Sequence, residues 1–145
     1  AIEVDKQAFT QAGAKQLPDL QLLKARLLFD GGYYGESLNV LNSINLTSVN
    51  GKEKLTELVY RKARAYDEMN QTDLALSNYN QAIESGTDLP RYFAANAALC
   101  AAEIFEKKGE KNKAIAYYER CLGFDNHEYK NGIDQKAKAA LNRLR

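Results

Sequence analysis

The sequence predicts an all-α fold of about seven or eight short helices, packed as antiparallel pairs. Three observations predict this class. Apolar and small residues recur at steps of three and four, which is the helical period, and there is no convincing alternation of strand length. Gly, Asn and their polar neighbours interrupt this pattern at short intervals, as turns between helices do. A pattern of small and large residues also returns at a nearly constant spacing, which is typical of repeat proteins.

Composition favours one soluble domain. A chain of 145 residues with 45% hydrophobic and 27% charged residues buries enough surface to fold without a metal or disulfide. Its net charge of +1 gives no global attraction to nucleic acid or to an anionic membrane. No apolar run reaches the roughly 18 residues of a membrane span, so we expect no membrane insertion. The chain begins at Ala1 and its one methionine is Met69, so we expect a processed or excised piece, of cytoplasmic or exported origin.

The first helix is expected within residues 3–16, where Ala8, Phe9 and Ala12 form an apolar side. The second begins at Pro18, since proline is tolerated in a first helical turn. It runs to about residue 30, where two glycines end it. Its expected buried set is Leu20, Leu23, Leu27 and Leu28.

The remaining helices follow in the same way, each ended by a glycine or a polar turn. We expect the next two at about 34–44 and 52–69. After a turn at 70–72 another helix runs to 86, and the one after it begins at 88–90 and runs to 108. The last two are expected at 111–122 and 133–144. In the helix at 52–69, the residues expected to form the stripe that faces the core are Leu55, Leu58, Val59, Ala63, Tyr66 and Met69.

The internal repeat appears when Ala25, Ala63 and Ala102 are aligned, at spacings of 63 − 25 = 38 and 102 − 63 = 39 residues. In each copy a large residue follows the alanine by three residues, a small residue follows it by twelve, and another large residue comes four after the small one. These residues are Leu28, Ser37 and Leu41 in the first copy, Tyr66, Ala75 and Tyr79 in the second, and Phe105, Ala114 and Tyr118 in the third. Small residues let two antiparallel helices approach closely, and the large ones fill the space between pairs. One pair cannot bury its apolar side alone, so pairs are expected to stack.

These residues resemble the tetratricopeptide repeat family. The resemblance covers about residues 17–122 and is best over 60–86; in the first copy Ile44 stands where a small residue is usual. It implies a right-handed superhelix in a single domain spanning 1–145: an N-terminal helix (1–16), three helix-pair repeats (17–45, 52–86 and 90–123) and a C-terminal capping helix (129–145). The repeats here exceed the usual length of about 34 residues. We expect the extra residues to lengthen the helices before Ala63 and Ala102 by about one turn.

The resemblance also implies a concave groove, lined by the first helix of each pair, that binds a peptide or helix of another protein. Ten residues beside the core stripes are expected to line it: Leu22, Arg26 and Phe29; Tyr60, Arg64 and Asp67; Tyr92, Asn96, Leu99 and Glu103. Tyr and Arg are enriched at binding hot spots. The alternatives are an ordinary solvated helix face and, for the whole chain, a structural or self-assembly module of a larger chain or a homo-oligomer.

The sequence offers no chemistry for catalysis, so we expect a non-catalytic scaffold without metal or cofactor. It has one histidine, no Gly-x-Ser-x-Gly elbow and no phosphate-binding loop. Cys100 and Cys121 are expected to be free buried thiols rather than a disulfide, and zinc binding with His127 lacks a fourth ligand. We expect His127 in an exposed loop. Tyr79 and Tyr118 are expected to pack in the core.

Overall fold

Helices account for every regular element in the part of the chain that the computed structural model describes, residues 17–125 and 127–145. They are α2 (Pro18–Asp30), α3 (Tyr34–Ser43), a short 3-10 helix η1 (Leu46–Ser48), α4 (Lys52–Glu68), α5 (Thr72–Gly86), α6 (Phe93–Lys107), α7 (Lys111–Leu122) and α8 (Lys130–Leu144). Over these residues the structure has no strand, which confirms the all-α prediction. The helix expected within 3–16 lies outside the described residues.

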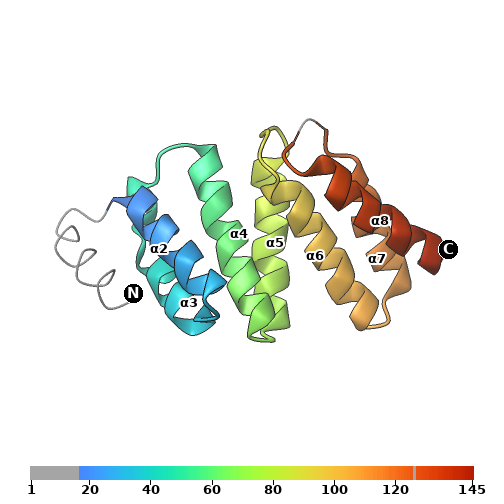
Figure 1. The fold of residues 1–145 in the computed structure, drawn as a ribbon, viewed down its shortest axis with the longest axis horizontal. Coiled ribbons are helices and arrows are strands. Elements are labelled where there is room, and N and C mark those ends of the chain that lie inside the picture. The colour runs from blue at the N-terminus through green and yellow to red at the C-terminus, as the bar shows by residue number, and fades with distance from the viewer. Residues whose placement is uncertain (1–16, 126) are drawn as a thin grey trace.

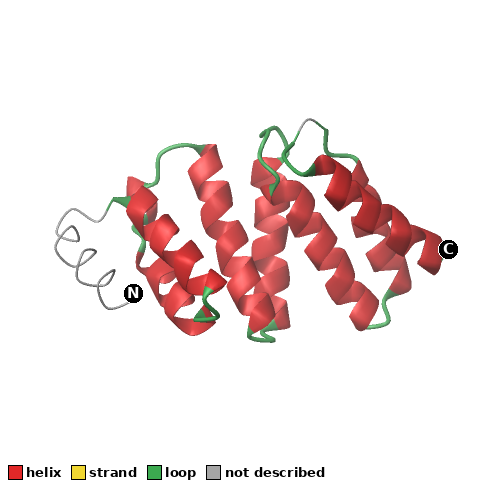
Figure 2. Cartoon of the chain, viewed as in Figure 1, coloured by secondary structure: helices red, strands yellow, loops and turns green. Residues whose placement is uncertain are grey.

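The helices stack in chain order from one end of the molecule to the other (Figures 1 and 2). Each helix packs against the next, so that α2 and α3, α4 and α5, and α6 and α7 form antiparallel pairs. The first helices of the pairs also contact one another in the order α2, α4, α6 and α8. This second set of contacts forms a continuous row of first helices, which carries the candidate site described below.

The turn inside each pair has the same backbone conformation. Gly32, Asn70 and Gly109 each lie seven residues after an aligned alanine, and their φ angles are 86°, 60° and 76°. The backbone N–H that follows donates to a carbonyl of the preceding helix, as in Tyr33 N to Leu28 O at 2.8 Å. The other two copies of this bond measure 2.9 Å. Asn, like Gly, tolerates the left-handed region, so one turn geometry serves all three pairs.

The core is where the repeat pattern predicts it. The three aligned alanines are fully buried, and Tyr79 and Tyr118 are among the largest fully buried side chains. Both tyrosines lie in one large cluster that runs from α4 to α8. A smaller cluster joins the first pair to α4: Leu22, Ala25, Leu41, Ile44 and Leu58. In the first pair the Ser37 hydroxyl donates to the Ala25 carbonyl at 2.7 Å, which satisfies a polar group at this buried crossing.

The predicted buried set of α2 is largely wrong. Leu28 is buried, but Leu20, Leu23 and Leu27 are exposed, and Gln21, Leu22 and Ala25 are buried instead. The reason is that α3 and α4 both lie on the Ala25 side of α2, whereas periodicity alone favours the side with more leucines. In α4, likewise, Leu55 and Met69 are exposed.

The predicted helix extensions are right for α4 and too long for α6. In the first pair α2 starts 25 − 18 = 7 residues before the alanine, α4 starts 63 − 52 = 11 before its alanine and α6 starts 102 − 93 = 9 before its own. Hence α4 gains about a full turn and α6 about half a turn. The remaining residues, 87–92, form the connector that contains Pro90.

Candidate functional site

The ten predicted groove residues do lie along the row of first helices. Leu22, Arg26 and Phe29 are on α2; Tyr60, Arg64 and Asp67 on α4; Asn96, Leu99 and Glu103 on α6; and Tyr92 directly precedes α6. Leu22, Tyr60 and Leu99 are only 3%, 4% and 4% exposed. These three therefore offer almost no surface to a partner.

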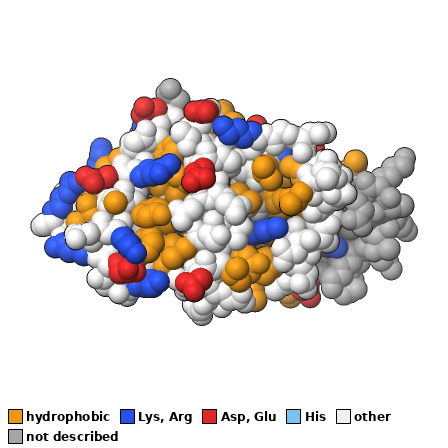
Figure 3. Space-filling model, turned by 180° about the vertical axis from the view of Figure 1, so that it is seen from behind, with side chains coloured by type: hydrophobic (Ala, Val, Ile, Leu, Met, Phe, Trp, Pro, Cys, Tyr) orange, Lys and Arg blue, Asp and Glu red, His pale blue; other side chains and the backbone are white. Residues whose placement is uncertain are grey.

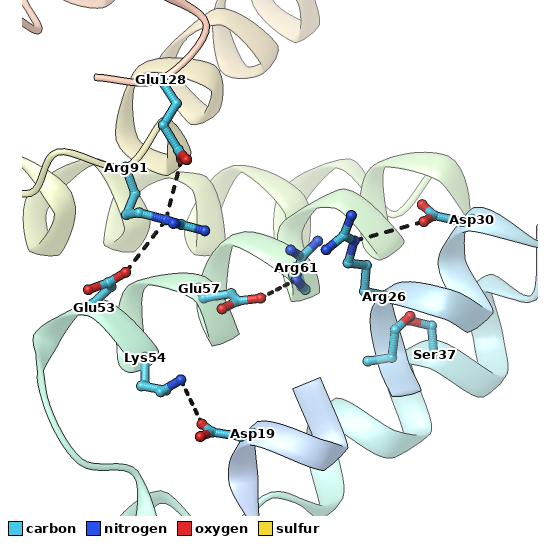
Figure 4. A network of polar contacts seen from close by, with 11 residues as sticks. Asp19, Arg26, Asp30, Ser37, Glu53, Lys54, Glu57, Arg61, Arg91 and Glu128 are labelled. Atoms are coloured by element: carbon cyan, nitrogen blue, oxygen red, sulfur yellow. Dashed lines mark hydrogen bonds and ion pairs between the residues drawn. The ribbon is translucent and has the colours of Figure 1, made fainter. Parts of the chain in front are cut away.

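A hollow of about 250 Å³ lies between α2, α4 and the start of α6, and we call it the arginine hollow. Its lining residues are Arg26, Phe29, Asp30, Tyr60, Arg61, Arg64 and Tyr92. The site prediction from sequence did not include Arg61. Its Nε donates to Glu57 Oε2 at 2.7 Å, one turn away, so its charge is already matched (Figure 4).

The other two arginines of this hollow have only loose carboxylate partners. Arg26 Nε is 4.0 Å from Asp30 Oδ2, and Arg64 Nη2 is 4.0 Å from Glu68 Oε1. The Arg64 guanidinium lies over the Phe29 ring, 5.4 Å from its centroid, which holds it between α2 and α4. Two guanidinium groups beside an aromatic ring thus retain donors for an acceptor from outside.

Tyr60 and Asn96 connect α4 to α6 beneath this surface. Asn96 Nδ2 donates to Tyr60 Oη at 2.7 Å. The Tyr60 ring meets the Tyr92 ring edge-on at a centroid distance of 5.7 Å and is 5.2 Å from the Phe93 ring. Burial raises the pKa of Tyr60 well above its usual value, so its hydroxyl stays neutral. This arrangement fixes the relative position of the two helices.

A second hollow, also of about 250 Å³, lies farther along α4 and α6, and we call it the acidic hollow. Its lining residues are Arg64, Asp67, Glu68, Asn70, Cys100, Glu103, Ile104 and Lys107. Burial raises the pKa of Glu103. Asp67 Oδ2 accepts a bond from the Tyr79 hydroxyl at 2.8 Å. Arg64 lines both hollows, so they are neighbours on one surface. Of this lining, the site prediction from sequence included only Arg64, Asp67 and Glu103.

Ion pairs flank the arginine hollow and join successive elements (Figure 4). Lys54 Nζ of α4 is 2.7 Å from Asp19 Oδ1 of α2. Arg91, in the connector before α6, lies 3.5 Å from Glu53 and 3.3 Å from Glu128. Most of these groups are well exposed, and such pairs contribute little individually. The charged groups of these pairs thus already have partners of opposite sign within the structure.

The face turned away from the view of Figure 1 shows no dominant charge. Figure 3 shows its basic and acidic side chains interspersed among apolar ones, without a broad area of one sign. A nucleic-acid footprint needs a broad basic face, and this side of the described structure does not offer one.

The two cysteines are free and buried, as predicted. Burial raises the pKa of Cys100 to about 11 and that of Cys121 to about 12, so both are thiols at neutral pH. The described residues contain no group of three His, Cys, Asp or Glu side chains arranged to hold a metal. His127 is 9% exposed, so the prediction of an exposed loop residue is wrong. Its Nδ1 lies 2.8 Å from the Glu128 carbonyl oxygen.

Helical hairpins stacked in a single row, with one repeated turn, define a helical-repeat protein. The tetratricopeptide repeat family matches the chain over residues 56–85 and again over residues 101–128. The first match spans most of α4 and α5, and the second spans the end of α6, all of α7 and the connector to α8. The two matches support the assignment of these helical hairpins to the tetratricopeptide repeat family. No curated protein matches the chain.

This assignment has a general functional meaning. Tetratricopeptide repeats are, as a class, protein–protein interaction modules and typically non-catalytic scaffolds. None of the helices in the described ranges is both long and apolar enough to cross a membrane.

Proposed function

We propose that this chain binds a peptide or helix of another protein along α2, α4 and α6. The observation that carries the proposal is the pair of neighbouring hollows that meet at Arg64. Seven of the predicted residues contribute accessible groups: Arg26, Phe29, Arg64, Asp67, Tyr92, Asn96 and Glu103. Three are buried, Leu22, Tyr60 and Leu99, and of these Tyr60 contacts Asn96 and Tyr92.

The charges of the two hollows favour a partner with charges of both signs. In the arginine hollow, Arg26 and Arg64 lack a close carboxylate, and guanidinium groups recognise carboxylates with paired donors. An acidic side chain of the partner fits there, with its carbon stem against Phe29 or Tyr92. In the acidic hollow, the three carboxylates of Asp67, Glu68 and Glu103 outnumber the two basic groups of Arg64 and Lys107, which favours a basic side chain of the partner. The partner segment therefore has a preferred direction along the row.

A charge-reversal pair tests this proposal. Arg26→Glu combined with Arg64→Glu places two negative charges in the arginine hollow. We expect capture of partners from a native lysate, and the affinity of each purified partner, to fall about tenfold or more, as for hot-spot residues. The matched control is Lys111→Glu combined with Arg120→Glu, which changes the net charge equally on exposed positions of α7.

The result is interpretable only if both variants are folded, which circular dichroism at 222 nm and the thermal unfolding midpoint establish. Equal loss of binding in the two variants would show a non-specific charge effect. Unchanged binding in the Arg26→Glu, Arg64→Glu variant would remove the groove assignment.

A further inference from the structure

In two of the helix pairs, a tyrosine of the second helix bonds a carboxylate near the end of the first. Tyr79 Oη of α5 donates to Asp67 Oδ2 of α4 at 2.8 Å. Tyr118 Oη of α7 donates to Glu106 Oε1 of α6 at 2.7 Å. The members of the two units correspond at the repeat spacing, since 118 − 79 = 39 and 106 − 67 = 39. The chain therefore contains the same unit of carboxylate and tyrosine twice.

The two units differ in their basic partner. Arg143 of α8 donates from Nη2 to both Glu106 oxygens, at 2.9 Å and 2.7 Å, and from Nε to Oε2 at 3.2 Å. This is the fork with which a guanidinium recognises a carboxylate. Asp67 has no ion pair within residues 17–125 and 127–145, and its other oxygen, Oδ1, accepts no hydrogen bond there. The Asp67 unit thus lacks the cation that the Glu106 unit has.

The helix that could supply this cation to Asp67 carries an apolar residue instead. α6 packs on α4 as α8 packs on α6. The residue of α6 that lies one repeat before Arg143 is Ile104, since 143 − 39 = 104. Ile104 is 7% exposed and lines the acidic hollow together with Asp67. The position that holds an arginine beside the Glu106 unit therefore has no charge in the acidic hollow.

The burial pattern of α8 supports this correspondence. At a spacing of 39 residues, four positions of α8 and four of α6 are buried in both helices: Ile133, Ala137, Ala140 and Leu141 with Ala94, Ala98, Ala101 and Ala102. The exposed Asn142 corresponds in the same way to the exposed Glu103. The two helices thus turn the same side toward the helix pair before them.

The two basic residues of the acidic hollow do not take the place of the missing arginine. Arg64 Nη1 lies 3.7 Å from Cys100 Sγ, and its Nη2 is 4.0 Å from Glu68 Oε1. Lys107 is exposed and forms no ion pair in the described ranges. Three carboxylates line the hollow beside these two cations, so one further positive charge balances the lining.

We propose that the acidic hollow selects an arginine of the partner, and that Asp67, bonded by the Tyr79 hydroxyl, is the residue that determines this choice. The proposal rests on the peptide-binding function proposed above. The partner's guanidinium donates two N–H groups to the Asp67 carboxylate, as Arg143 does to Glu106. A lysine ammonium is a compact point charge without this fork, so the hollow prefers arginine to lysine.

Selection from a library of random peptides displayed on phage tests the proposal. The library is panned on wild type, on Asp67→Asn and on the control Glu84→Gln. Asparagine removes the charge of Asp67 but keeps an oxygen that can accept from Tyr79. Glu84→Gln removes the same charge from an exposed position of α5 that lines neither hollow. Circular dichroism and the thermal unfolding midpoint check that all three proteins are folded.

We expect the peptides selected on wild type and on Glu84→Gln to be enriched in arginine over lysine, and this enrichment to be absent on Asp67→Asn. A synthetic copy of a selected peptide then has its arginine replaced by citrulline, which has nearly the same shape but no charge. This replacement should lower the affinity for wild type about tenfold or more, as for a hot-spot residue. It should lower the affinity for Asp67→Asn less than about threefold, because only groups in contact are coupled.

The possible outcomes separate this inference from the function on which it rests. Binding peptides without arginine enrichment, or with equal enrichment on Asp67→Asn, would overturn the inference and leave peptide binding intact. The same holds if citrulline lowers the affinity equally for wild type and Asp67→Asn. Selection of no peptide on any of the three proteins would count against peptide binding itself, and the inference would fall with it.

Discussion

Gly86 offers the sharpest test of how tightly the repeats are packed. It is the last residue of α5 and is buried where α4, α5 and α6 meet. A Cβ atom at this position would lie 2.9 Å from Ala94 Cβ and 3.0 Å from Thr56 Cγ2. Its two neighbours belong to two different helices, so relief requires a shift of both. Gly86→Ala adds one methyl group to this junction and nothing else.

The size of the effect follows from these distances. Carbon atoms in contact are ordinarily about 3.5–4.0 Å apart, so the added methyl is short of room by about 0.5–1 Å. Overpacking of this kind costs about 1–3 kcal/mol. Alanine gains at most about 1 kcal/mol over glycine in a helix interior, and less at a last residue. We expect Gly86→Ala to lower the free energy of unfolding by about 1–2 kcal/mol.

Urea and thermal unfolding followed by circular dichroism at 222 nm measure this change. A loss of 1 kcal/mol corresponds to about 2–4 °C in Tm for a chain of this size. Gly132→Ala in α8 is the matched control, because its new methyl meets nothing within 4 Å. It should stabilise the fold by about 0.4–1 kcal/mol. If Gly86→Ala proves as stabilising as Gly132→Ala, the close approach of the three helices is refuted.

Two further predictions concern titrating groups. Because burial keeps Cys100 and Cys121 protonated, we expect both to resist iodoacetamide at pH 8 in the folded protein and to react in urea; rapid labelling without urea would contradict their burial. Hydrogen bonds from the Tyr118 hydroxyl and the Arg143 guanidinium lower the pKa of Glu106. The Glu106 carboxylate therefore stabilises the fold at a pH above the pKa that this group has in the unfolded chain. This stabilisation is lost as the pH falls through the pKa that Glu106 has in the folded protein. The difference in unfolding midpoint between wild type and Glu106→Gln should therefore be larger at pH 7 than at pH 3, and a pH-independent difference would count against this role.

The sequence by itself determined the repeated unit. The small residues at Ala25, Ala63 and Ala102 set the helix crossings, and Tyr79 and Tyr118 fill the spaces between pairs. These features were predictable because they depend on spacing within one or two helices, where the helical period fixes which residues share a side. The turns were predictable for a similar reason, since a left-handed residue favours Gly or Asn wherever the chain must reverse.

The tertiary structure decided which side of each helix has a neighbour. The leucines of α2 have the right period for a core, yet the core lies on the Ala25 side, because α3 and α4 are there. The candidate site divides in the same way. Its stripe of residues was visible in the sequence, but the burial of Leu22 and Leu99 was not. The meeting of two hollows at Arg64 was not visible in the sequence either. Burial and hollows both depend on the distance between helices that are separated by a whole repeat, and the sequence pattern does not give that distance.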